Sequence, residues 1–340
     1  MNLHLRPDAL AEWTAAVFET CDVPAEQAAE AAAMLVRSEL RGYRTHGMTR
    51  LASYVDRLQS NAFNPRPKMT SRSFPGGIVL DADGAMGHVA GPHAVRLGLE
   101  ALETSASVLI VLQSCAHLGA LGIHTLLAAE GGAFSMMGQH TPPALAMEGF
   151  SGGAIGHNPI AFGCPVPGEA PIVFDVACSV AARGHILLAA RENKPIPEGW
   201  ALDAEGRPTT DANRALDGFL VPMGGHKGIG IAMMVECLAG ALTATAATAP
   251  TPHVKRGDAM QGAFLWLVKP DSFNGQQAFS DYMRKWTQIY LVAGGEDARL
   301  PGNRGDAMER AGRKQGIALP APIIHELQSL GERLRIRFPD

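Results

Sequence analysis

The sequence predicts an α/β protein in which a sheet core is joined to helical ends. Three observations support this class. Apolar residues make up 46% of the 340-residue chain and charged residues 18%, which excludes a disordered protein and provides a sizeable core. Apolar runs of strand length are interspersed with segments of helical periodicity, and both ends of the chain are predominantly helical. The length is typical of about two domains.

Two helices are predicted near the N-terminus. The first follows Pro24, a residue type favoured at helix starts, and Gly42 is expected to end it. Its apolar residues recur at helical spacing, namely Ala28, Ala32, Leu35, Val36 and Leu40. The second helix is expected to begin at Thr49 as N-cap. Its apolar face would comprise Leu51, Tyr54, Val55 and Leu58. Residues 41–50, between the two helices, form an unusually charged linker.

The middle of the chain is predicted to hold the sheet. Its expected strands are Ile78–Asp81, Val108–Gln113, Ile160–Phe162, Ile172–Phe174 and Ala263–Val268. Residues 61–75 contain three prolines and indicate a linker. Further helices are expected over about 119–130, 228–244 and 305–338. This pattern predicts a helical domain from residues 1–70 plus 305–340, and an α/β core domain from 71–304.

Composition excludes several partners and compartments. A net charge of −4 and a pI near 6.3 argue against nucleic acid. Five widely spaced cysteines without a C-x-x-C pair argue against disulfides and structural zinc, and favour the reducing cytoplasm. The N-terminal residues lack the apolar core of a signal peptide. The apolar stretch at 228–250 carries Glu236, which favours a buried helix over a membrane span.

Common catalytic and nucleotide-binding motifs are absent. The G-x-G-x-x-G fingerprint fails because Gly228 and Gly230 are followed by Met233, so a standard Rossmann domain is not expected. The phosphate loop G-x-x-x-x-G-K-[ST] and the metalloprotease motif H-E-x-x-H do not occur. His88 and His93 have poor spacing for metal ligands on one helical face, and no metal site is predicted.

Thr45, His46, Gly47 and Arg50 form the first of three candidate clusters. An arginine binds carboxylates through two parallel hydrogen bonds, and a histidine can exchange a proton near neutral pH. Their pairing predicts a site that holds a carboxylate next to a proton donor. A polar corner between two helices is the alternative interpretation.

The other two clusters each open a predicted helix. Ser114–Gly122 follows a buried strand, at a position where helix N–H groups can face an anion. Gly224–Gly230 places four glycines around His226 and Lys227, which would let the backbone approach a phosphate with a lysine as counter-charge. The alternatives are an ordinary strand-to-helix turn and a flexible turn.

Taken together and in order, these clusters resemble the second malate/L-lactate dehydrogenase family, which includes sulfolactate, ureidoglycolate and diketogulonate enzymes and cyclic imino acid reductases. The similarity runs from about residue 25 to 317. The matching stretches are Leu40–Gly42, Thr45–Gly47 with Arg50, His117–Gly119, Gly156–Phe162, Phe174–Ser179, Pro197–Asp211, Pro222–Gly230 and Pro301–Gly302. The resemblance implies a nicotinamide-dependent oxidoreductase with a non-Rossmann fold, using NAD or NADP, and a homodimer.

The resemblance also assigns roles to residues. His46 would be the proton donor, with Thr45 and Asp175 in its charge relay, and Arg50 would bind the carboxylate of a small 2-oxo or 2-hydroxy acid. The residues that would line the dinucleotide are His117, Leu118, Gly119, Ala120, Leu121, His226, Lys227, Pro301, Gly302, Asn303 and Arg304.

Several positions depart from the family pattern. His157 stands where the family has a substrate-contacting Thr, so the substrate is expected to differ. Asn303 replaces the Glu of Pro-Gly-Glu, Ala116 replaces an Asn, and Thr243–Gly257 is short and rich in Pro and Ala. Two functional alternatives remain at this point: a cyclic imino acid reductase using the same site, and a binding protein without turnover. A metal hydrolase is a more distant third.

Overall fold

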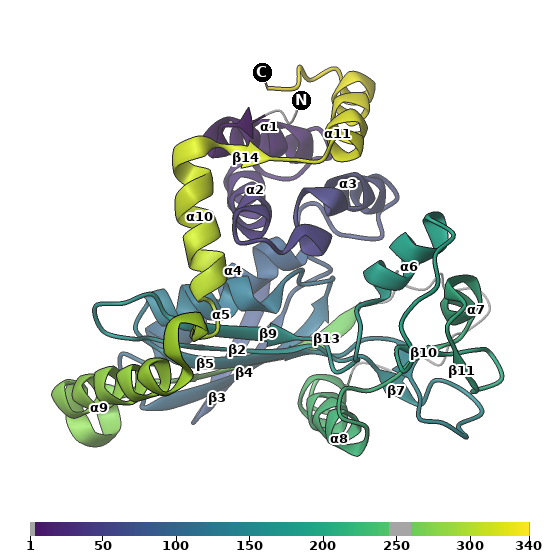
Figure 1. Cartoon of the computed structure of the whole chain (residues 1–340). Coiled ribbons are helices and arrows are strands. Elements are labelled where there is room, and N and C mark those ends of the chain that lie inside the picture. The colour runs from purple at the N-terminus through teal and green to yellow at the C-terminus, as the bar shows by residue number, and fades with distance from the viewer. Residues whose placement is uncertain (1–3, 245–259, 340) are drawn as a thin grey trace.

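The computed structural model describes residues 4–244 and 260–339 (Figure 1). Its main sheet has seven strands in the order β2-β3-β4-β13-β5-β8-β9. Their bounds are β2 (Thr70–Phe74), β3 (Gly77–Asp81), β4 (Ser107–Cys115), β13 (Gln261–Val268), β5 (Phe134–Gln139), β8 (Ile160–Cys164) and β9 (Ile172–Val176). Within this sheet β3 and β4 run parallel, and the other neighbours are antiparallel. A mixed sheet of this order confirms the predicted non-Rossmann α/β class.

Helices cover both faces of this sheet. On one face, α4 (Gly87–Ala101) and α5 (Leu121–Glu130) bury a core that includes Leu265 of β13. On the other, Phe264 packs against Val235 at the end of α8 (His226–Val235) and against Ala239 in the π-helical turn Glu236–Ala241. Phe264 and Leu265 serve different cores because adjacent side chains of a strand point to opposite faces. The segment α9 (Asp271–Gly294), which is kinked at Gly275, extends from the edge of the molecule (Figure 1).

A second, five-stranded sheet lies beside the first in the order β11-β10-β12-β6-β7 (Figure 1). Its short strands are β6 (Pro143–Leu145), β7 (Ile155–Gly156), β10 (Ala201–Leu202), β11 (Pro208–Thr209) and β12 (Phe219–Leu220). Together with α6 (Arg183–Arg191), α7 (Ala212–Asp217) and the start of α8, it encloses a separate apolar core around Leu145, Ile186 and Leu220.

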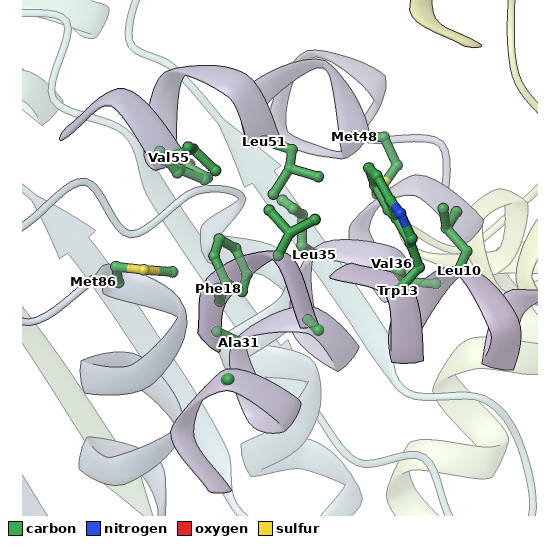
Figure 2. Packing of buried hydrophobic residues seen from close by; sticks show 14 of the residues in the cluster. Leu10, Trp13, Phe18, Ala31, Leu35, Val36, Met48, Leu51, Val55 and Met86 are labelled. Atoms are coloured by element: carbon green, nitrogen blue, oxygen red, sulfur yellow. The ribbon is translucent and has the colours of Figure 1, made fainter. Parts of the chain in front are cut away.

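The two ends of the chain share a third core. It is formed by α1 (Pro7–Glu19), α2 (Ala25–Leu40), α3 (Leu51–Gln59) and α11 (Ala321–Leu334), and Figure 2 shows Trp13, Phe18, Leu35 and Leu51 within it. Strand β1 (His4–Leu5) pairs with β14 (Ile317–Ala318), and α10 (Asn303–Gln315) connects this unit to the sheet (Figure 1). The domain boundaries at residues 70 and 305 stay predictions.

Several predicted elements differ in detail. Residues 61–75 include β2, whose five residues are all exposed at the sheet edge and therefore show no apolar pattern. The hydroxyl of Thr49 donates to the Arg44 carbonyl at 2.6 Å instead of capping a helix, and α3 begins at Leu51. The predicted C-terminal helix is interrupted by β14. Residues 245–257 of the Pro- and Ala-rich segment lie outside the described residues.

The helix predicted over 228–244 begins earlier, at His226, and changes to π-helical geometry at Glu236. None of the helices in the described ranges is long and apolar enough to cross a membrane.

Candidate active site

The segment after α2 makes a tight corner that places the first cluster. Gly42 has φ +83, which only glycine adopts readily, and the chain then forms two 3-10 turns, Arg44–His46 and Met48–Arg50. Glu39 Oε2 accepts a hydrogen bond from the Met48 N–H at 3.0 Å. A Cβ on Gly47 would overlap that same oxygen and lie 3.1 Å from the Cα of Glu39, so glycine leaves room for this hydrogen bond.

His46 is held in a defined orientation. Its Nδ1 lies 2.9 Å from the hydroxyl of Thr45, and its ring stacks on His117 with centroids 5.6 Å apart and planes at 25°. Burial lowers the pKa of His46 to about 4, and Arg50 and His157 add to this effect. The imidazole is therefore neutral near pH 7, with Nδ1 held by Thr45 and Nε2 left for a ligand.

Arg50 presents an open guanidinium fork next to this imidazole. Its Nε donates to the Thr45 carbonyl at 2.7 Å. Its two terminal nitrogens have no acceptor among the residues that the structure describes, and the side chain is exposed. Such a fork suits a carboxylate bound through two parallel hydrogen bonds.

Asp175, at the end of β9, lies beside the N-terminus of α5. Its Oδ2 accepts a hydrogen bond from the Gly122 N–H at 2.8 Å, and burial raises its pKa to about 6, although this hydrogen bond lowers it. Within the described ranges no hydrogen bond joins Asp175 to His46. The relay implied by the resemblance is thus not closed by direct contact here.

His157 approaches the same site from the second sheet. Its Nδ1 lies 3.3 Å from the hydroxyl of Thr141, and it follows β7 directly. A Cβ on Gly184 of α6 would lie 3.5 Å from the Thr45 methyl group. The charge of His157 also helps to lower the pKa of His46, so the site is bordered by the loop before α3, by the residue that follows β7 and by α6.

The three segments predicted to line a dinucleotide meet along β9. The Val173 N–H donates to the Pro301 carbonyl at 3.0 Å, and Asp175 accepts from Gly122. Two residues beyond the strand, the Cys178 carbonyl accepts from the Met223 N–H at 2.9 Å. Segments that are far apart in the chain are thus brought to one strand.

A helix begins at each of these three segments. Ala120, Gly225 and Gly302 precede α5, α8 and α10, and none of these three residues caps its helix with a side chain. In the first turn of α5, the Gly122 N–H is already bonded to the Asp175 carboxylate. Gly302 has φ +94, and a Cβ there would lie 2.9 Å from the Val173 nitrogen. Uncapped helix N-termini attract anions, and exposed Lys227 and Arg304 add positive charge in the first turns of α8 and α10. This chemistry fits the pyrophosphate of a dinucleotide.

Two tyrosines border the site without being predicted to do so. The sequence places Tyr54 on the buried face of its helix, and it is buried, but its hydroxyl lies 3.0 Å from Nδ1 of His117. A Cβ on Gly122 would lie 2.6 Å from the Tyr43 hydroxyl and 3.1 Å from Asp175 Oδ2, so Tyr43 borders the acid. No group of three or more His, Cys, Asp or Glu residues in the described ranges could hold a metal ion.

The fold and the site together define a class: a non-Rossmann α/β enzyme that can hold a carboxylate beside a histidine and an anionic cofactor along β9. Comparisons with known proteins identify the family. The family model described as malate/L-lactate dehydrogenase matches residues 5–328. The chain therefore belongs to the malate/L-lactate dehydrogenase family and is an oxidoreductase, which confirms the family predicted from the motifs.

Individual relatives span nearly the whole chain. A Delta(1)-pyrroline-2-carboxylate reductase of Ancylobacter novellus is 33% identical over 317 residues, covering 91% of this chain and 92% of that protein. An L-sulfolactate dehydrogenase of Methanothermobacter thermautotrophicus is 30% identical over 331 residues, covering 95% and 94%. The solved structure of a delta1-piperideine-2-carboxylate reductase from Pseudomonas syringae pvar. tomato has a TM-score of 0.89 at 26% identity, covering 96% and 99%.

Proposed function

We propose that this protein is an NAD(P)-dependent oxidoreductase that interconverts a small 2-oxo acid and the corresponding 2-hydroxy acid. The observation that carries the proposal is the open fork of Arg50 beside neutral His46, with Thr45 holding one nitrogen of His46 and the Nε of Arg50. A substrate carboxylate on Arg50 would bring the neighbouring carbon and its oxygen to the imidazole.

In this proposal His46 moves the proton. In the oxidation direction its neutral Nε2 accepts the hydroxyl proton, and in the reduction direction its imidazolium returns a proton to the oxygen where negative charge develops. The substrate carboxylate would neutralise Arg50, whose charge helps to lower the pKa of His46. Substrate binding would thus raise this pKa and favour the protonated form.

The nicotinamide cofactor would accept or supply the hydride. We propose that the N-terminal turns of α5, α8 and α10 hold it, through His117–Leu121, His226 with Lys227, and Pro301–Arg304. The support is the shared position of these turns along β9 and the uncapped N-termini of α8 and α10. The backbone N–H groups and positive charges of these turns would suit NAD and NADP alike.

A cyclic imino acid is the second candidate substrate. Pyrroline- and piperideine-2-carboxylate carry a carboxylate next to the reducible carbon, so Arg50 and His46 could serve the same positions. The observation that favours it is the 33% identity to a Delta(1)-pyrroline-2-carboxylate reductase.

A substrate panel tests the proposal. Purified protein would be assayed with NADH and with NADPH against pyruvate, oxaloacetate, sulfopyruvate and the two cyclic imino acids, following nicotinamide absorbance. We expect turnover on at least one of the oxo acids. Turnover on the cyclic imines alone would select the second candidate. Binding of the cofactor, seen as fluorescence quenching, without any turnover would favour a binding protein and contradict both.

Arg50→Lys is expected to impair substrate recognition. Lysine keeps the positive charge but cannot form two parallel hydrogen bonds to a carboxylate, so kcat/KM should fall by roughly tenfold or more. Steady-state kinetics on the preferred substrate measures this. Arg72→Lys, on the exposed edge strand β2, is the matched control. Equal kcat/KM for Arg50→Lys and the control would contradict the carboxylate role.

We also propose that the enzyme is a homodimer of cytoplasmic location. The support for dimerisation is α9, where Tyr282, Trp286, Ile289 and Tyr290 recur at helical spacing and are 42–69% exposed. All five cysteines are free, which suits a reducing compartment. Light scattering after size-exclusion chromatography should give twice the chain mass, and Ile289→Lys should shift it toward the monomer. A monomeric wild type would contradict the dimer.

A further inference from the structure

Tyr54 connects α3 to the loop that follows β4. It lies one helical turn after Arg50, so both residues belong to one face of the same segment. Its side chain is 3% exposed and packs against Phe63, with ring centroids 6.1 Å apart, and against the edge of His88 at 5.2 Å. The ring is thus fixed from two sides, and its hydroxyl reaches Nδ1 of His117 at 3.0 Å.

His117 is in turn the aromatic neighbour of the proposed proton carrier. Its ring stacks on His46 at 5.6 Å, and its side chain is only half-buried. Within the described part of the chain, Nε2 of His117 has no hydrogen-bond partner, whereas Nδ1 has Tyr54. One nitrogen is therefore held by the protein and the other is left for a ligand beside His46.

The protonation of the two side chains determines which of them donates the hydrogen bond between Tyr54 and His117. Burial lowers the pKa of His117 well below its usual value, so the ring is neutral and carries one proton. If Nδ1 carried it, the buried phenol proton of Tyr54 would have no acceptor in the described structure. Leaving a buried donor unpaired is costly, whereas an O–H donated to a bare Nδ1 satisfies both groups.

We propose that Tyr54 is a positioning residue that fixes His117 in the tautomer protonated at Nε2, so that His117 offers a hydrogen-bond donor to the ligand beside His46. The structural part of this inference concerns His117 alone. Its catalytic part rests on the proposed function: the donor would act on the negatively charged group of the substrate or on the oxygen that becomes negative.

Nitrogen NMR of histidine-labelled protein tests the tautomer directly. A protonated and an unprotonated ring nitrogen have well-separated shifts, and a His117→Gln variant assigns the His117 signals. We expect wild-type His117 to be protonated at Nε2. In Tyr54→Phe, which keeps the ring and removes the hydroxyl, we expect an average over both tautomers. Protonation at Nδ1 in the wild type, or an unchanged signal in Tyr54→Phe, would overturn the proposal.

Kinetics tests the consequence. Tyr54→Phe should lower kcat/KM roughly tenfold, about the effect of one net hydrogen bond. Phe63→Leu is the control, because it loosens the same packing but retains the hydroxyl, and it should lower the melting temperature without changing the His117 signals. If no substrate is turned over, the proposed function fails while the NMR result still decides the tautomer. A fixed tautomer in the wild type with unchanged kcat/KM in Tyr54→Phe would overturn the catalytic part.

Discussion

His46→Ala is expected to lower kcat on the preferred substrate by about 10²–10⁴-fold, the usual contribution of a general acid or base. The fold should persist, because His46 is only half-buried and belongs to a short 3-10 turn outside the hydrophobic cores. Binding of the reduced cofactor, measured by fluorescence, should change little. A variant that keeps the wild-type kcat would show that another group moves the proton.

The pH profile separates this role from a structural one. In the oxidation direction, kcat/KM reports the free enzyme, in which His46 must be neutral to accept a proton. Because its pKa is lowered to about 4, wild-type kcat/KM should lose its His46-dependent part only as the pH falls toward 4. In His46→Ala, this loss of kcat/KM at acidic pH should disappear. His325→Gln, at an exposed position on α11, serves as the control and should retain the wild-type profile.

Apolar periodicity is sufficient to predict the elements with a buried face. The face Leu51, Tyr54, Val55 and Leu58 is buried as predicted, and the run Val108–Gln113 lies within β4. Strand β2 cannot be predicted in this way because all its residues are exposed. Helix α9 is not among the predicted elements, although Tyr282, Trp286, Ile289 and Tyr290 recur at helical spacing; these side chains are exposed, so the apolar stripe does not face a core of this chain.

The candidate site is predictable to the extent that its residues are neighbours in sequence. Thr45, His46 and Arg50 belong to one short segment, so a tight corner is enough to bring them together. The meeting of Gly122, Met223 and Pro301 along β9 depends on sheet topology, which no local pattern reveals. The role of Tyr54 is hidden because a tyrosine on an apolar face fits both a core position and a polar contact.

Acid should weaken the fold through two buried histidines. His88 and His124 are 2% and 1% exposed, and burial lowers their pKa values to about 3 and about 4. Unfolded, each has a pKa of about 6.5, so the unfolded chain binds more protons below that pH. The free energy of unfolding therefore falls as the pH drops from about 6.5 toward 4, by about 2 kcal/mol per histidine at pH 5. Asp175 acts in the opposite direction, since its pKa is raised to about 6, and offsets part of this loss.

His124→Gln isolates one of these contributions. In the folded protein Nε2 of His124 lies 2.9 Å from the Leu118 carbonyl, and a glutamine amide can supply that donor without titrating. The free energy of unfolding, measured with urea, should differ less between pH 7 and pH 5 in the variant than in the wild type, by about 2 kcal/mol. His325→Gln replaces a histidine at an exposed position and is the control, which should retain the full difference. An unchanged pH dependence in His124→Gln would contradict the expectation, because it would mean that this ring binds protons equally in the folded and the unfolded chain between pH 7 and pH 5.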